Sequence, residues 1–198
     1  MSNDAGCGFD RLDLAGNGLK FTSEPMLIAL ILVVFPFCMA FAAVSDMLSM
    51  TIANRVALVL AATFLVVAPL TGMPWDAYGM HIAGGAAVLA VTFGLFALGG
   101  MGGGDAKLMS ATALYFGFGF QLIEYLVVSA FVGGLLTLAI LIYRKSPISV
   151  VTGHNLFLRH FADSRTGIPY GIALGIGGLM VYPQSPLMLW AVDQLAGR

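Results

Sequence analysis

Residues 26–45 read MLIALILVVFPFCMAFAAVS and contain no charged side chain. A helix that crosses the hydrocarbon core of a bilayer needs about 20 mostly apolar residues. We therefore expect a membrane-spanning helix here, with a kink at Pro36 because proline removes a helical hydrogen bond. The composition agrees, because 59% of the chain is hydrophobic and only 10% is charged, whereas about 25% of a soluble domain is charged. This stretch decides the fold class, an all-α polytopic membrane protein.

Further apolar stretches after residue 45 predict five more spans. The stretch 106–142 is too long for one helix, and GFGF at 117–120 predicts a turn between two short ones. The expected spans are 26–45, 54–71, 79–98, two within 106–142, and 167–182. We expect a six-helix membrane domain over 25–182, preceded by a polar segment (1–24) and followed by a short interfacial tail (183–198).

The basic residues predict the orientation of this domain. Lys and Arg favour the cytoplasmic side of short loops. In the six-span arrangement six of them fall on one face, namely Arg55, Lys107, Arg144, Lys145, Arg159 and Arg165. A single crossing by 106–142 would separate the last four from the first two. We therefore expect six crossings, a basic cytoplasmic face and both termini outside the cytoplasm.

Composition also limits the ligands that the chain is expected to bind. A net charge of −1 gives no indication of nucleic-acid binding. The two cysteines, Cys7 and Cys38, form neither a CxxC pair nor a disulfide framework. His154 and His160 do not have zinc-ligand spacing. We expect no metal and no cofactor.

The most unusual stretch is GGMGGGDAKL at 99–108. It is a poor nucleotide loop, because GxGxxG would need glycine where Asp105 stands, and a P-loop would need GK followed by Ser or Thr. A helix cap is a stronger interpretation, since Asp is a good N-cap and glycines let helices approach closely in lipid. This interpretation does not explain a second acidic residue on the same face.

That second residue is Asp46, in SDMLSMTIAN at the end of the first predicted span. Two crossings separate it from Asp105, so both aspartates are expected at the same, basic membrane surface. Two close carboxylates share one proton. One of them then takes a proton from water while the other donates to a scissile carbonyl. From the residues alone, interfacial caps or a proton relay are equally open.

Three segments resemble the type IV prepilin peptidases, which are GxGD aspartyl proteases of the membrane. Gly102-Gly103-Gly104-Asp105 fits GxGD, and GGGDAKL, with Lys107, is similar to that family's extended motif. DMLSMTIAN at 46–54 is similar to its first aspartate segment. Ile168-Pro169-Tyr170-Gly171 resembles its late Pro-aromatic-Gly motif.

The resemblance implies a catalytic pair, Asp46 and Asp105, acting without metal. The residues expected to shape the cleft or bind substrate are Gly102, Gly103, Gly104, Lys107, Asn54, Pro169 and Tyr170. Lys107 is equally expected as a positive flank of a span, and Asn54 as a helix cap. The implied substrate is a prepilin or pseudopilin, cut at the cytoplasmic face of a bacterial inner membrane after a short basic leader.

The chain also departs from the family's pattern. Ala53 replaces the usual proline of Ile-Pro-Asn, which should alter the start of the second span. No CxxC is present, so methyl transfer is not expected, and the chain looks like the short, peptidase-only branch similar to the CpaA or TadV enzymes of Flp/Tad pilus systems. Presenilin-like relatives carry a Pro-Ala-Leu motif, which is missing here. Two other classes stay open: a small proton-coupled transporter, and a non-catalytic assembly subunit of a pilus or secretion system.

Overall fold

A computed structural model describes residues 13–145 and 168–197, with side chains from Glu24 onward. The described residues form seven α-helices and one short 3-10 helix, and no strand. In chain order they are α1 (Asp13–Ser49), α2 (Asn54–Leu70), α3 (Trp75–Ala97), α4 (Gly103–Phe116), α5 (Phe120–Lys145), α8 (Tyr170–Val181), η1 (Tyr182–Gln184) and α9 (Pro186–Ala196). The all-α prediction is confirmed.

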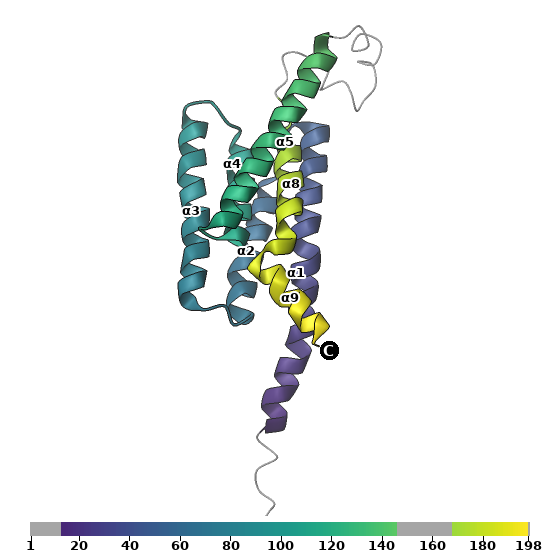
Figure 1. The fold of residues 1–198 in the computed structure, drawn as a ribbon, viewed down its shortest axis with the longest axis vertical. Helices are drawn as coiled ribbons and strands as arrows, with labels where there is room; N and C mark the ends of the chain where they lie inside the picture. Colours follow the sequence, from purple (N-terminus) through teal and green to yellow (C-terminus); the bar gives the residue numbers. More distant parts are fainter. Residues whose placement is uncertain (1–12, 146–167, 198) are drawn as a thin grey trace, which may run out of the picture.

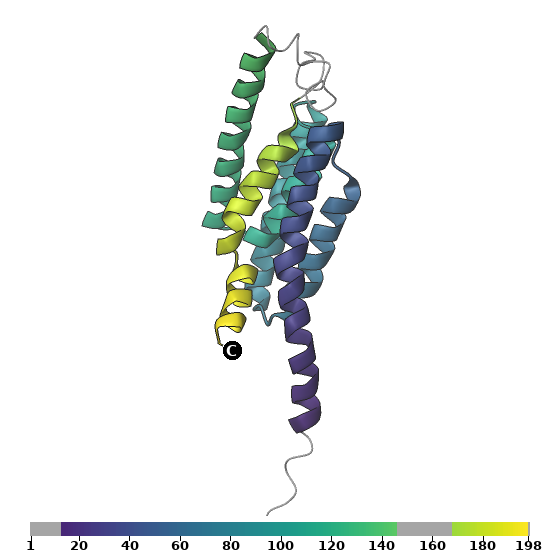
Figure 2. The same cartoon turned by 90° about the vertical axis from the view of Figure 1, so that its right-hand side faces the viewer.

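The helices form an elongated bundle in which successive helices from α1 to α8 alternate in direction (Figures 1 and 2). α1, α3 and α5 run toward the upper end of Figure 1, and α2, α4 and α8 run back from it. α1 extends below the bundle and α5 extends above it. The upper end of the bundle therefore collects the last turns of α1 and α3 and the first turns of α2, α4 and α8.

Three described helices are long and apolar enough to cross a membrane: Glu24–Ser49 within α1, Trp75–Ala97 and Phe120–Lys145. Tyr170–Gln184 and Pro186–Ala196, bent by 47°, make a fourth if they count as one span. The six predicted spans are therefore not all present as full-length helices. α4 has 14 residues and is about 21 Å long at 1.5 Å per residue, less than the roughly 30 Å hydrocarbon core.

The turn predicted at 117–120 is present between α4 and α5, at Gly117–Gly119. It packs against α3, where the N–H of Phe118 donates to the carbonyl of Met80 at 3.0 Å. Gly117 has a φ of +67°, which favours glycine. A Cβ on Gly84 would lie 2.8 Å from the carbonyl carbon of Gly117. Glycines on both sides thus allow the turn to contact the α3 backbone.

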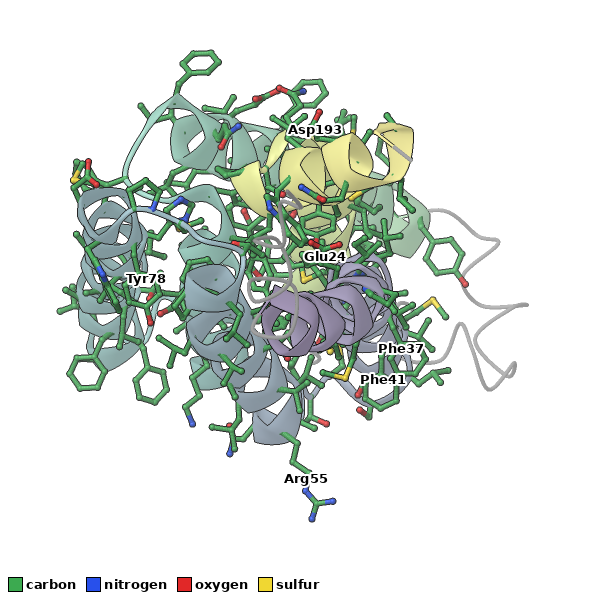
Figure 3. All side chains as sticks on the ribbon, turned by 90° about the horizontal axis from the view of Figure 1, so that it is seen from below. Glu24, Phe37, Phe41, Arg55, Tyr78 and Asp193 are labelled. Atoms are coloured by element: carbon green, nitrogen blue, oxygen red, sulfur yellow. The ribbon has the colours of Figure 1, made fainter. Side chains whose placement is uncertain are left out.

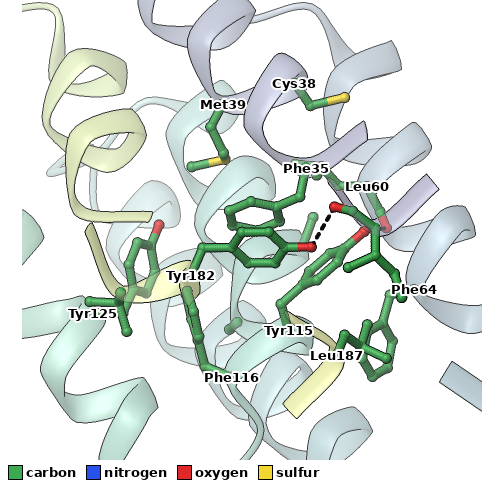
Figure 4. Close-up of a cluster of buried hydrophobic side chains, with 14 of the residues drawn as sticks. Phe35, Cys38, Met39, Leu60, Phe64, Tyr115, Phe116, Tyr125, Tyr182 and Leu187 are labelled. Atoms are coloured by element: carbon green, nitrogen blue, oxygen red, sulfur yellow. Dashed lines mark hydrogen bonds between the residues drawn. The ribbon is translucent and has the colours of Figure 1, made fainter. Parts of the chain in front are cut away.

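The core is built around stacked aromatic rings (Figure 4). Phe35 of α1 stacks on Tyr182 with ring centroids 3.9 Å apart, and its ring lies 4.6 Å from Tyr115 of α4. Both tyrosine hydroxyls are satisfied: Tyr115 donates to the carbonyl of Leu60 at 2.9 Å, and Tyr182 to that of Ile31 at 2.7 Å. Buried hydroxyls need such partners. The cluster joins α1, α2, α4 and η1, and so fixes the helices that hold the site.

The outside of the bundle is apolar as well. Phe37 of α1 is 67% exposed and Phe41 is also exposed, and both point away from the bundle in Figure 3. Many large apolar side chains on α2, α3 and α5 are likewise exposed. A soluble protein rarely exposes so much contiguous apolar surface, so this surface identifies an integral membrane protein.

Candidate active site

Asp46 lies in the last turn of α1, at the upper end of the bundle in Figure 1. Its side chain is buried, with 5% of its surface exposed. Its Oδ2 accepts a hydrogen bond from the N–H of Gly171 at 2.6 Å. Since Gly171 belongs to the first turn of α8, the carboxylate of one helix end meets the unpaired amides of another.

The connection from α1 to α2 holds Asp46 in place. Met50, directly after α1, has a φ of +52°, the left-handed conformation common after helix ends. The hydroxyl of Ser45 donates to the carbonyl of Thr51 at 2.9 Å, and that of Ser49 to the carbonyl of Ser45 at 2.8 Å. The bond from Ser45 ties the end of α1 to the connection that follows it.

Asp105 lies in the first turn of α4. The N-cap of that helix is Gly102, and no side chain caps it. The interpretation of Asp105 as an N-cap is therefore wrong, because α4 begins at Gly103, before the aspartate. Its Oδ2 lies 2.9 Å from where a Cβ of Gly102 would be. A side chain at position 102 would displace the carboxyl.

Two glycines allow the helices of the site to approach each other. A Cβ on Gly104 of α4 would lie 3.2 Å from the Cβ of Ile52. A Cβ on Gly171 of α8 would lie 2.8 Å from the Cδ1 of the same isoleucine. Ile52, in the connection after α1, is therefore wedged between the first turns of α4 and α8. This contact brings the segments that carry Asp46 and Asp105 together.

The two carboxyl groups also interact electrostatically. Asp105 lies outside the candidate spans, and burial together with the nearby Asp46 carboxylate raises its pKa to about 6. A carboxyl group near a carboxylate holds its proton more tightly, because ionising it would place two like charges close together in a poorly solvated environment. Burial and the like charge therefore favour a pair that holds one proton below about pH 6.

Lys107 and Asn54 contact each other. The Nζ of Lys107 donates to the Oδ1 of Asn54 at 3.0 Å. The bond ties the first turn of α4 to the first residue of α2, so two expected cleft residues join the two aspartate segments from the exposed side. Arg55, the next residue, points away from the bundle (Figure 3).

Pro169 and Tyr170 stand where α8 begins. Pro169 is the buried N-cap of α8, and Tyr170 is its first residue. The ring of Tyr170 packs on α5, where a Cβ on Gly133 would clash with the Cε2 of the ring. Gly133 thus leaves room for the tyrosine beside the aspartates.

A large apolar groove leads away from this site. Its volume is about 1240 Å³. Residues of α3, α4 and α5 line it, together with the glycine-rich 99–102 segment. Asp105 and Tyr170 lie at its head, and Phe118 and Phe120 lie at the level of the α4–α5 turn. One carboxyl of the pair, that of Asp105, therefore lines a mostly apolar space.

Sequence reasoning named most of these residues and missed two contacts. It named Gly171 as part of the Pro-aromatic-Gly motif, whereas the N–H of this glycine donates a hydrogen bond to Asp46. It gave Ile52 no role beyond its motif. Backbone donors and wedge residues leave no chemical signature in a sequence. The only available signal for Gly171 was its place directly after Pro169 and Tyr170.

Comparison with known proteins finds a match to one protein family. The sequence model described as the type IV leader peptidase family matches residues 33–142. The match covers more than half of the chain and includes Asp46, Asn54, Asp105 and Lys107. The segment at 168–171 lies beyond the matched residues. No curated protein and no solved structure matches the chain.

Proposed function

Because the chain belongs to the type IV leader peptidase family, we propose that Asp46 and Asp105 are the catalytic pair of its peptidase reaction. Membership makes the protein an aspartic peptidase that removes leader peptides from prepilins. The observation that supports the pair is a set of contacts: Ile52 packs on Gly104 of the Asp105 helix and on Gly171, whose N–H donates to Asp46. The nearby Asp46 carboxylate also raises the pKa of Asp105.

In the proposed reaction the pair starts with one proton. The ionised carboxylate takes a proton from a water molecule while the water oxygen bonds to the scissile carbonyl carbon. The protonated carboxyl gives its proton to the carbonyl oxygen, which produces a neutral gem-diol. The C–N bond then breaks as the nitrogen receives the proton taken from water, and a diol proton returns to the second carboxyl.

The groove supports a proposal for substrate binding. We place the apolar segment of the prepilin along the groove, with the scissile bond at its head beside Asp105. Binding there is favourable because the apolar segment leaves water and because it packs more closely against the groove than against lipid. Gly102 leaves the backbone at the head of the groove open to an extended peptide.

The membrane arrangement also belongs to this proposal. We propose six crossings, with Asp105 immediately before the fourth, and an active site on the cytoplasmic side of a bacterial inner membrane. The charge pattern supports this orientation, since Arg55 and Lys107 lie at the same end of the bundle as the aspartates. A short, peptidase-only enzyme of the Flp/Tad type without methyl transfer agrees with the absence of CxxC from the sequence.

Cleavage of a prepilin by membranes that contain the protein tests the pair. Asp46→Asn and Asp105→Asn should each lower the cleavage rate roughly 10²–10⁴-fold, because each removes a proton-transfer group. Asp193→Asn is the matched control, since it makes the same change at an exposed position of α9, and it should cleave at the wild-type rate. The reaction is followed by the size shift of the prepilin at matched expression.

Other outcomes identify the rival classes. Full cleavage by both site variants would make the aspartates structural and overturn the pair. A wild-type protein that cleaves no prepilin but moves protons, with both variants inactive in that movement, would support the transporter. Pilus assembly that tolerates both substitutions would support the assembly subunit.

A further inference from the structure

The two aspartates have different surroundings. The Oδ2 of Asp46 accepts the N–H of Gly171 at 2.6 Å. Gly171 is the second residue of α8, and the first amides of a helix have no acceptor within it. A hydrogen-bond donor and the positive end of a helix both favour an ionised carboxylate.

Asp105 lacks such a donor. Within residues 24–145 and 168–197, no hydrogen bond reaches its carboxyl. It faces the groove instead, beside Met109 and Tyr170. A carboxyl that faces apolar side chains and a neighbouring carboxylate favours the protonated form.

The other charged groups near the pair do not reverse this difference. On α4, Lys107 directs its ammonium to Asn54 of α2. Arg55 of α2 points away from the bundle (Figure 3). On α8, the titratable group nearest the pair is the phenol of Tyr170, which is neutral below its ordinary pKa of about 10. None of these described groups offers Asp105 the donor that Asp46 has.

We infer that Asp46 is the ionised general base, that Asp105 is the protonated general acid, and that the N–H of Gly171 is the positioning donor that sets this division. The inference rests on the proposed function, because it assigns roles within that pair. Asp46 accepts the water proton, and Asp105 donates to the carbonyl oxygen. When the C–N bond breaks, Asp46 passes its proton to the nitrogen and Asp105 regains one from the gem-diol.

The position also requires glycine. A Cβ at position 171 would lie 2.8 Å from Oδ2 of Asp46 and 2.8 Å from Cδ1 of Ile52. Real Cβ atoms do not approach other atoms this closely, so a side chain would push the carboxylate off the amide. A substitution at Gly171 therefore changes sterics and hydrogen bonding together, and a cleaner test removes the N–H alone.

An amide-to-ester replacement makes that change. Glycolate is incorporated at position 171 of the full chain by nonsense suppression during cell-free synthesis into nanodiscs. The matched control places the hydroxy-acid analogue of leucine at position 187, which is the second residue of α9 and lies outside the site. The pH dependence of prepilin cleavage is measured for wild type and both esters, and thermal unfolding checks the fold.

The acidic limb of the rate profile reports ionisation of the base, and the alkaline limb reports loss of the acid's proton. Without the N–H, ionised Asp46 is less favourable, so the acidic limb should move up by about one pH unit while the alkaline limb stays. The Leu187 ester should leave both limbs in place. A shift of the alkaline limb alone would make Asp105 the base, and unmoved limbs or a folded but inactive ester would equally overturn the assignment.

A second measurement does not depend on the ester or on activity. Infrared spectroscopy of the carboxyl bands follows the single remaining site carboxyl in Asp46→Asn and Asp105→Asn protein, with the double variant as blank. The carboxyl left in Asp46→Asn should lose its proton at higher pH than the one left in Asp105→Asn. The opposite order would overturn the inference, whereas failure of the proposed function appears separately, as variants that still cleave.

Discussion

At the scale of the residue, the ionisation of Asp105 makes the stability of the fold depend on pH. Burial and the Asp46 carboxylate raise its pKa from an ordinary value of 3.8 to about 6. Between these values the folded protein binds more protons than the unfolded chain, so this carboxyl makes stability fall as pH rises from about 4 to 6. Above pH 6 the full cost of the buried charge is present.

Asp105→Asn removes that cost. The variant should therefore be more stable than wild type above pH 6, by on the order of 1 kcal/mol, and the difference should shrink toward pH 4. Thermal unfolding in detergent at several pH values measures it. An equal difference at pH 4 and pH 7 would show that Asp105 does not titrate in this range.

The residues of the site could be predicted better than their contacts. Asp46 and Asp105 could be identified because carboxylates are rare in apolar sequence. The hydrogen bond from Gly171 to Asp46 could not be predicted. Every residue except proline has an N–H, and only the fold decides where it points. The helix-cap interpretation of Asp105 was wrong because α4 starts two residues earlier, within the glycines.

At the scale of the element, the connection between α1 and α2 already has the geometry that proline prefers. Ala53 is the N-cap of α2 with a φ of −63°, and proline fixes φ near −65°. The described hydrogen bonds do not use its N–H. The alanine thus leaves the start of α2 at Asn54, so the expectation that it alters this start has no support in the backbone angles.

Ala53→Pro should therefore stabilise the protein by about 0.4–1 kcal/mol, by restricting the unfolded chain. Ala61→Pro, within the same helix, is the matched control and should destabilise by about 3 kcal/mol. Unfolding temperatures in detergent compare the two variants with wild type. A lower unfolding temperature for Ala53→Pro would mean that the first turn of α2 differs from this geometry.

Helices were easier to predict than spans. Apolar stretches predicted the helices, and the glycines at 117–119 predicted the α4–α5 turn. Both signals are local, because hydropathy and backbone freedom belong to the residues themselves. The length of α4 could not be read in this way. The turn after α4 lies part-way along the bundle, because the N–H of Phe118 hydrogen-bonds to the carbonyl of Met80 and Gly117 packs on Gly84. A contact between segments so far apart in the chain leaves no local signal in the sequence.

At the scale of the whole molecule, the groove connects the site to the membrane surface of the bundle. Val91 of α3 lines it and is 65% exposed. Val91→Trp should partly fill the groove and lower kcat/KM for a full-length prepilin roughly tenfold, equivalent to about 1.4 kcal/mol. Val66→Trp of α2, which is 60% exposed and does not line the groove, is the control. Equal effects of the two variants in a cleavage assay would show that substrate does not use the groove.

The most direct test of the catalytic pair is a double-mutant cycle on cleavage rate. Wild type, Asp46→Asn, Asp105→Asn and the double variant are compared at matched expression in membranes without another prepilin peptidase. Groups that act as one unit are not additive, so the double variant should be no slower than the slower single variant. Losses that multiply would show two independent carboxylates and would contradict a shared-proton pair.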